Sequence, residues 1–186
     1  MDVVGNVERP FGSFPGPELS RQPVGALAST IPLTAVGTTP LTTTTTVTNC
    51  ASIILPENLT VTSLGLLVCV AGTATGTWLA LLDNGLRVRG VTANSAGLAT
   101  GFQNVALGTP FVTPYAGLYY VAYGTVSTVA PQVAAQAAGP TVAGVSGPPV
   151  YAGTTSTAAS TTPPAVGAVL GALTGVAAAE FYAQIL

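Results

Sequence analysis

The side chains able to carry out chemistry are few in this sequence and lie far apart. Its 186 residues include six carboxylates, four arginines and two cysteines, with no lysine and no histidine. Without histidine, no Ser-His or Cys-His pair and no imidazole metal site can form. A carboxylate pair for glycoside hydrolysis needs two acids close together in space, and the predicted β body offers only Glu57, Asp83 and Glu180. We therefore expect a protein that is not an enzyme and that uses no metal or cofactor.

The remaining acidic and thiol groups have structural explanations. Asp83 begins the run D-N-G, which is typical of a tight hairpin turn because Asn and Gly tolerate positive φ. We assign Glu180 to the exposed face of the last strand. Cys69 lies in the apolar run L-G-L-L-V-C-V and is expected to be a small buried residue. The first ten residues lack the pattern of a secretion signal, so we expect none, and a disulfide between Cys50 and Cys69 is the less favoured interpretation.

Binding is the chemistry that remains. Aromatic side chains are common anchors at protein interfaces, and they also stack on sugar rings. The candidates are Phe11 and Phe14 near the N-terminus and Tyr119, Tyr123 and Tyr151 in the body, as interface or glycan-binding aromatics. We expect the single tryptophan to pack in the core instead.

The body is organised around residues 115–124, which read Y-A-G-L-Y-Y-V-A-Y-G. Period-two alternation gives this segment two faces. One face carries Leu118, Tyr120 and Ala122, and the other carries Tyr119, Val121 and Tyr123. Because both faces are large and mostly apolar, the pattern predicts a central strand of a sheet.

Further strands with turn signals between them complete the body. We expect strands over 52–55, 59–70, 77–82, 86–91, 101–107 and 109–113, with a loop at 72–76. Alanine favours a helix over 165–186, but three glycines and an alternating ending favour a hairpin of 166–173 and 177–185. The sequence therefore predicts an all-β fold, an antiparallel β-sandwich of the jelly-roll kind, over residues 49–186.

Residues 1–48 are predicted to be an extended Pro-rich N-terminal arm and a Thr-rich connector. Four prolines within the first 23 residues exclude a helix and favour extended chain. Such a segment is either a disordered tail or an arm that docks on neighbouring subunits, and its apolar residues favour the arm. The side chains assigned to docking are Val4, Arg9, Phe11, Phe14 and Arg21. The Thr-rich run at 38–48 is a connector or an edge strand.

Charge is unusually sparse. Only 5% of the residues are charged and the net charge is −2, against about 25% charged residues in a typical soluble domain. No basic patch for nucleic acid and no polybasic segment for lipid is present. The apolar run 165–179 is shorter than the roughly 20 residues of a membrane span. Low charge promotes association, so we expect a homo-oligomer that binds neither nucleic acid nor membrane.

Several runs of the body have a familiar order. They are L-P-E-N-L-T-V-T-S-L-G-L-L-V-C-V, W-L-A-L-L-D-N-G-L, P-F-V-T-P-Y-A-G-L-Y-Y-V-A-Y, G-V-S-G-P-P-V-Y-A-G-T, T-T-P-P-A-V-G-A-V-L and E-F-Y-A-Q-I. In this succession they resemble the small β-sandwich domains of virion proteins from tailed phages that infect actinobacteria. The resemblance covers roughly residues 51–186.

The resemblance implies a non-enzymatic virion protein: a capsid decoration, minor capsid or minor tail protein. Such a protein would be assembled into the virion in the host cytoplasm, and its partners would be the major capsid protein or other virion subunits. The scarcity of charge favours a capsid decoration or minor capsid protein packed among copies of itself. The alternative is a minor tail or fibre module that binds host-surface glycan through its aromatics.

Overall fold

The computed structural model describes residues 26–31, 36–37, 40–43, 47–137, 152–155, 157–174 and 179–186. Within these ranges the chain forms fourteen strands and no helix, which confirms the predicted all-β class. The five longest strands are β3 (Thr48–Leu55), β4 (Thr60–Val70), β5 (Thr73–Leu82), β7 (Gly101–Val112) and β8 (Gly117–Val129). The shorter ones are β1 (Ala28–Ser29), β2 (Leu41–Thr42), β6 (Val88–Val91), β9 (Gln132–Val133), β10 (Ala135–Ala137), β11 (Ala152–Thr155), β12 (Leu173–Thr174), β13 (Ala179–Phe181) and β14 (Ala183–Ile185).

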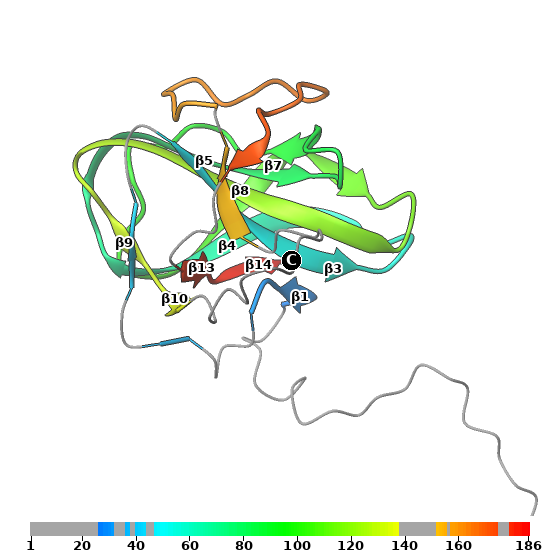
Figure 1. The fold of residues 1–186 in the computed structure, drawn as a ribbon, viewed down its shortest axis with the longest axis horizontal. Coiled ribbons are helices and arrows are strands. Elements are labelled where there is room, and N and C mark those ends of the chain that lie inside the picture. Colours follow the sequence, from blue (N-terminus) through cyan, green and yellow to red (C-terminus); the bar gives the residue numbers. More distant parts are fainter. Residues whose placement is uncertain are drawn as a thin grey trace, which may run out of the picture.

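Two six-stranded antiparallel sheets pack against each other (Figure 1). In the first, called sheet A, the order is β1-β14-β4-β9-β2, and β7 pairs with the other side of β4. In the second, called sheet B, the order is β12-β11-β3-β8-β5-β6. An isolated bridge between Thr92 and Leu107 joins the two sheets beside β6 and β7. The architecture is the predicted sandwich, with one side partly closed.

Strand β8 lies inside sheet B, paired with β3 on one side and β5 on the other. Its two faces are those that the alternation predicted. Tyr119, Val121 and Tyr123 belong to the core between the sheets. Tyr120 and Ala122 belong to a second core on the outer face of sheet B. The prediction of a central strand is confirmed.

The core between the sheets is built from alternate residues of both sheets. Its members from sheet A include Val61, Leu64, Leu66 and Val68 of β4 together with Ala183 and Ile185 of β14. Phe181 of β13 joins them, so Phe181, Ala183 and Ile185 share one apolar face, as predicted from their spacing. Sheet B contributes Ala51, Ile53, Leu55, Leu79 and Leu81 beside the inner residues of β8.

The outer face of sheet B is covered by residues 157–172, which we call the strap. The strap is the orange segment that runs along one side of the molecule in Figure 1, opposite β1 and β14. Trp78 Nε1 donates a hydrogen bond to the carbonyl of Ser160 at 2.8 Å, and Leu170 of the strap is buried in the second core. The predicted packing of the tryptophan in the core is confirmed.

The predicted hairpin near the end of the sequence is wrong. The expected hairpin of 166–173 with 177–185 does not form, because most of its first half lies in the strap. β12 pairs with β11, whereas β13 pairs with β10 and β14 pairs with β4 and β1. Leu170 and Leu173 of the first half pack on sheet B, and Phe181, Ala183 and Ile185 of the second half fill the core between the sheets.

Other boundaries also differ from those predicted. β7 is one strand rather than two, and its pairing with β4 shifts register between Val61 and Ser63. β5 begins at Thr73, inside the expected loop at 72–76. β1 and β2 pair with β14 and β9, so the sandwich includes short strands from the region that was predicted to precede it at 1–48.

Close packing of Trp78 on Gly124 gives a stability prediction. A Cβ atom at position 124 would overlap the Trp78 ring, whose side chain is buried. We expect Gly124→Ala to lower the free energy of unfolding by about 1–3 kcal/mol, as overpacking in a core does. The matched control is Gly108→Ala, where the nearest atom would be 3.6 Å away and the change should be within about 0.5 kcal/mol. Urea unfolding measures both, and equal midpoints for the two variants would contradict the packing argument.

Candidate interaction surfaces

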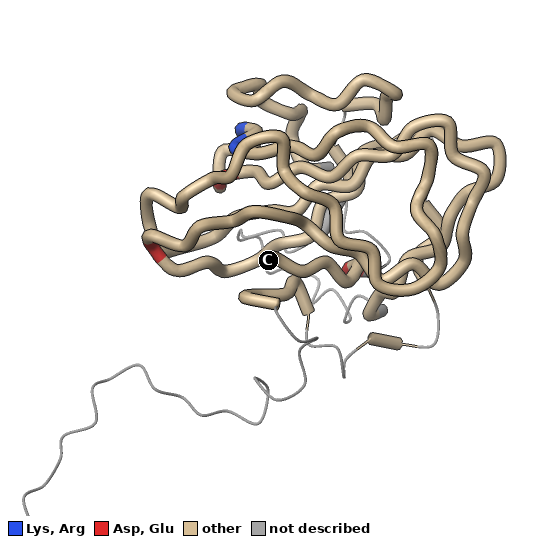
Figure 2. Tube along the Cα trace, turned by 180° about the vertical axis from the view of Figure 1, so that it is seen from behind, with Lys and Arg blue, Asp and Glu red and all other residues tan. Residues whose placement is uncertain are grey.

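Charge is nearly absent from the surface of the described residues. Five charged side chains occur there, namely Glu57, Asp83, Arg87, Arg89 and Glu180, and Figure 2 shows long stretches of chain between them without any. Glu57 and Arg87 are exposed, but Asp83 is only 6% exposed. Hydroxyl, amide and backbone groups therefore provide most of the polar surface of this part of the chain.

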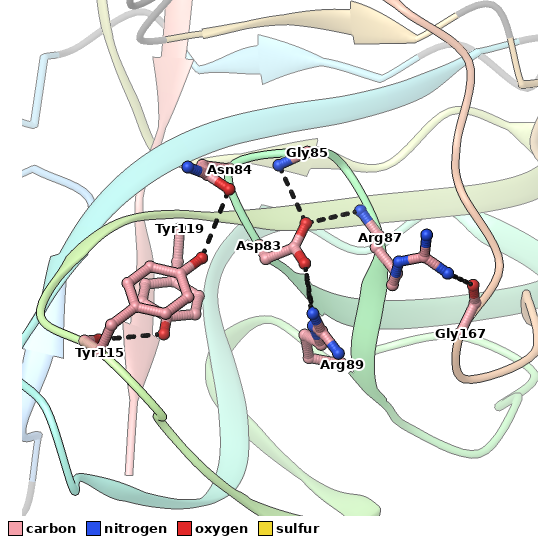
Figure 3. A network of polar contacts seen from close by, with 8 residues as sticks. All are labelled: Asp83, Asn84, Gly85, Arg87, Arg89, Tyr115, Tyr119 and Gly167. Atoms are coloured by element: carbon pink, nitrogen blue, oxygen red, sulfur yellow. Dashed lines mark hydrogen bonds and ion pairs between the residues drawn. The ribbon is translucent and has the colours of Figure 1, made fainter.

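Asp83 is the centre of a polar network at the turn between β5 and β6 (Figure 3). Its Oδ1 accepts hydrogen bonds from the backbone N–H groups of Gly85 at 2.9 Å and Arg87 at 3.0 Å. Its Oδ2 forms an ion pair with Arg89, 2.8 Å from Nη2 and 2.9 Å from Nε. These bonds hold the turn, in which Leu86 has a φ of +59°. The predicted turn role of Asp83 is confirmed, and both carboxylate oxygens are occupied.

The network extends to the strap and to the start of β8 (Figure 3). Arg87 donates from Nη1 to the carbonyl of Gly167 at 3.0 Å, which ties the strap to the turn. Tyr115 stacks on Tyr119 with ring centroids 5.0 Å apart, and the Tyr119 hydroxyl donates to the Tyr115 carbonyl at 3.1 Å. Burial raises the pKa of Tyr119 to about 12. We call this network, centred on Asp83, the Asp83 latch, because it joins the turn to the strap and its role is structural.

The tyrosines proposed for glycan binding are not at the surface. Tyr119 is 0% exposed and Tyr123 is 1% exposed, and both rings pack between the sheets. Their prediction as surface aromatics is wrong for the isolated chain, because β8 is covered on both faces. Tyr151 lies outside the described residues. So do the five side chains assigned to arm docking, Val4, Arg9, Phe11, Phe14 and Arg21.

Glu180 is partly buried rather than exposed, which corrects its predicted position. It lies in β13, opposite Gln136 of β10, and its carboxyl bonds to Ser52 of β3. Burial raises the pKa of Glu180 to about 7, and the bond from Ser52 opposes that shift. The expectation failed because β13 pairs with β10 and also packs against β3 and β11, instead of forming the second strand of the expected hairpin.

The two cysteines are free and occupy opposite environments. Cys50 is buried in the second core, and burial raises the pKa of its thiol to about 12. Cys69 is exposed, so its predicted burial is wrong. The apolar run around Cys69 continues past the covered part of β4, and its last two residues extend beyond the core.

The described residues contain no group of three His, Cys, Asp or Glu side chains that could hold a metal ion. The same ranges hold no helix long and apolar enough to cross a membrane.

Large apolar side chains lie at the surface in several places. Among the described residues, the eight that are more than 40% exposed are Leu27, Ile54, Val70, Phe102, Val112, Val129, Val166 and Val169. Phe102 is the aromatic member of the set and points outward from β7, in phase with Asn104 and Ala106. The sequence analysis did not select it. The available signal was the two-residue spacing that puts Phe102 on the same strand face as Asn104 and Ala106. Val105 and Leu107 lie on the opposite face, toward the core.

No protein-family model, no curated protein and no solved structure matches this chain. The likeness to phage virion proteins consequently rests on the order of the sequence runs alone.

The Asp83 latch predicts a specific loss of stability. Asp83→Ala removes the acceptor of two backbone N–H groups and the partner of Arg89. We expect the free energy of unfolding to fall by about 2 kcal/mol, the scale of hydrogen bonds to a charged group. Glu57→Ala is the matched control, since this carboxylate is exposed on a turn, and its effect should be within about 0.5 kcal/mol. If both variants unfold at the same urea concentration, the latch does not stabilise the fold.

The raised pKa of Glu180 predicts a pH dependence. The folded carboxyl titrates at about 7, and an unfolded one at about 4.3. Between these values the folded state holds a proton that the unfolded state has lost. The free energy of unfolding should therefore fall as the pH rises through this window and level off above it. Urea midpoints at about pH 5 and about pH 8 measure the slope.

Variants identify the group responsible for that slope. Glu180→Gln, which cannot ionise, should flatten the profile and make the protein more stable than the parent above neutral pH. Glu57→Gln should keep the parent's slope, because this side chain is exposed. An unchanged slope in Glu180→Gln would show that another group titrates.

Proposed function

We propose that this chain is a non-enzymatic structural protein of a phage virion, a capsid decoration or minor capsid protein. It associates with copies of itself and docks on the major capsid protein through the arm at its N-terminus. The protein is located in the virion, into which it is assembled in the host cytoplasm. The virion assignment is supported by the sequence resemblance, and the role as an assembled subunit is supported by the surface.

The observation that carries the subunit role is an exposed surface with large apolar groups and almost no charge. Eight large apolar residues are more than 40% exposed in the described chain, while Glu57 and Arg87 are the only charged residues exposed there. Burial of apolar surface contributes about 25 cal/mol per Å². Subunit contacts cover such groups without any cost of burying unpaired charge.

Glycan binding by a tail or fibre module is less well supported. Two of its three candidate aromatics, Tyr119 and Tyr123, have no exposed ring face for a sugar. A buried tyrosine cannot stack on a ligand unless the sandwich opens. Assembly is the better-supported function for this reason.

Removal of the arm tests the proposal. The deletion should end at residue 25, because β1 at Ala28–Ser29 pairs with β14 and the N–H of Leu27 donates to the carbonyl of Ile185 at 2.8 Å. We expect the shortened chain to keep the unfolding midpoint of the parent and to be lost from purified particles. Quantitative gels of virions measure the number of copies incorporated.

Substitutions within the arm provide the control. Phe11→Ala combined with Phe14→Ala should reduce incorporation, because it removes the two aromatic anchors. Ser13→Ala combined with Ser20→Ala should leave it unchanged. Normal incorporation of the chain that lacks residues 1–25 would refute docking through the arm, and absence of the full chain from virions would refute the proposed function.

A further inference from the structure

The two sheets differ in how their outer faces are covered. The strap lies over the outer face of sheet B, and the second core fills the space beneath it. On sheet A, Ile31 and Val36 pack over Tyr182 and Leu67 beside β14. The outward residues of β4 and β7 next to this cover remain open. Phe102, Asn104, Ala106 and Val112 of β7 and Thr60 of β4 are all exposed. We call this surface the open face.

The open face has an exposed aromatic residue near one end, because Phe102 is the second residue of β7 and pairs with Leu67. The Phe102 ring meets the buried Tyr182 ring edge to face, with centroids 6.0 Å apart. The Tyr182 hydroxyl donates to Gln184 Oε1 at 3.2 Å, and Gln184 Nε2 donates to Asn104 Oδ1 at 2.7 Å. These amides lie over Gly65, which has no side chain to displace them. Phe102 and Asn104 are thus held in place before any partner arrives, which lowers the entropic cost of binding.

The composition of the open face suits contact with an identical face. A two-fold contact brings each residue near its own copy or near its neighbours' copies, so a charge of one sign on the patch would meet the same charge. None of the outward residues of β4 or β7 is charged. Its polar groups are hydroxyls and an amide, which both donate and accept hydrogen bonds. One sheet face can also pack on another, with the two layers about 10 Å apart.

We propose that the open face of β4 and β7 is the surface through which two copies of this chain associate, with Phe102 as the anchor. This inference rests on the proposed function, since it names the contact between copies that the function requires. Two strands of 11 and 12 residues cover a strip roughly 40 Å long and about 10 Å wide. That is about half of the 800 Å² per partner found in stable complexes. The contact is therefore weak between free molecules and strengthens where copies are held side by side on a shell.

The free thiol of Cys69 provides a natural probe. Cys69 is exposed on β4, two residues beyond Leu67, which is the strand partner of Phe102. Cys50 is buried, so alkylation of the folded full chain reports on Cys69. Raising the protein concentration from about 1 µM to about 1 mM, the range in which weak contacts form, should slow iodoacetamide alkylation severalfold. The sedimentation coefficient should rise over the same range.

Three substitutions test whether the contact between copies lies on the open face. Ala106→Asp places a carboxylate on the open face, and both concentration effects should disappear. Phe102→Ala should weaken self-association by about tenfold or more, as loss of an interface anchor does. Val166→Asp is the matched control, because Val166 is 62% exposed on the strap, away from the open face, and should behave like the parent. Parent-like unfolding midpoints for all three variants show that the fold is intact.

The proposal is overturned if the Cys69 reactivity and the sedimentation coefficient of the parent chain do not change with concentration. It is also overturned if Ala106→Asp and Phe102→Ala still self-associate like the parent, or if Val166→Asp abolishes self-association. These measurements use the purified chain without particles. A negative result for self-association would not contradict docking through the arm. Normal incorporation of the chain that lacks the arm would not contradict the contact between two open faces.

Discussion

The fold depends on burying both faces of β8. A strand with tyrosines and apolar residues on both sides needs a covering layer on each of them. Sheet A covers the inner face, where Tyr119 and Tyr123 pack. The outer face, with Tyr120, has no second sheet, and the irregular strap takes that place through Trp78 and Leu170. The strap is thus a third layer that the sequence of β8 requires, and the Asp83 latch fastens it through Arg87.

Sparse charge changes how this molecule avoids and makes contacts. Many proteins protect the edges of their sheets with charged side chains. Here the strap pairs with the edge of β6 at Val88, and Pro110 removes a backbone donor from β7. Edge-to-edge pairing is restricted by these devices, whereas the open face of sheet A has no such protection. The difference directs association toward faces of sheets rather than their edges.

The sequence was sufficient to predict much of the fold. Alternation identified both faces of β8, the D-N-G run identified the turn at Asp83, and the spacing of the last residues identified the face shared by Phe181 and Ile185. These features are local, so a single segment contains the necessary signal. The class and the sandwich architecture followed from them.

The failures concern which segments lie beside one another. Residues 166–173 read as a strand because a strap with buried apolar residues has the same composition as a strand. Cys69 and Glu180 were misplaced because their exposure depends on whether a distant segment covers them. The candidate surface was missed for the same reason. Phe102 is outward on β7, but only the pairing with β4 and the position of Tyr182 show how it is held at the surface.

The position of β14 has a consequence for how the protein is made. The last strand is an inner strand of sheet A, between β1 and β4, and joins residue 28 to residue 185. Until residues 179–186 have left the ribosome, β4 lacks its neighbour along Leu64–Leu66, and the core lacks Phe181 and Ile185. Such long-range pairing slows folding. The sandwich is therefore completed only after these residues emerge, which leaves a period in which apolar strands are open to other nascent chains.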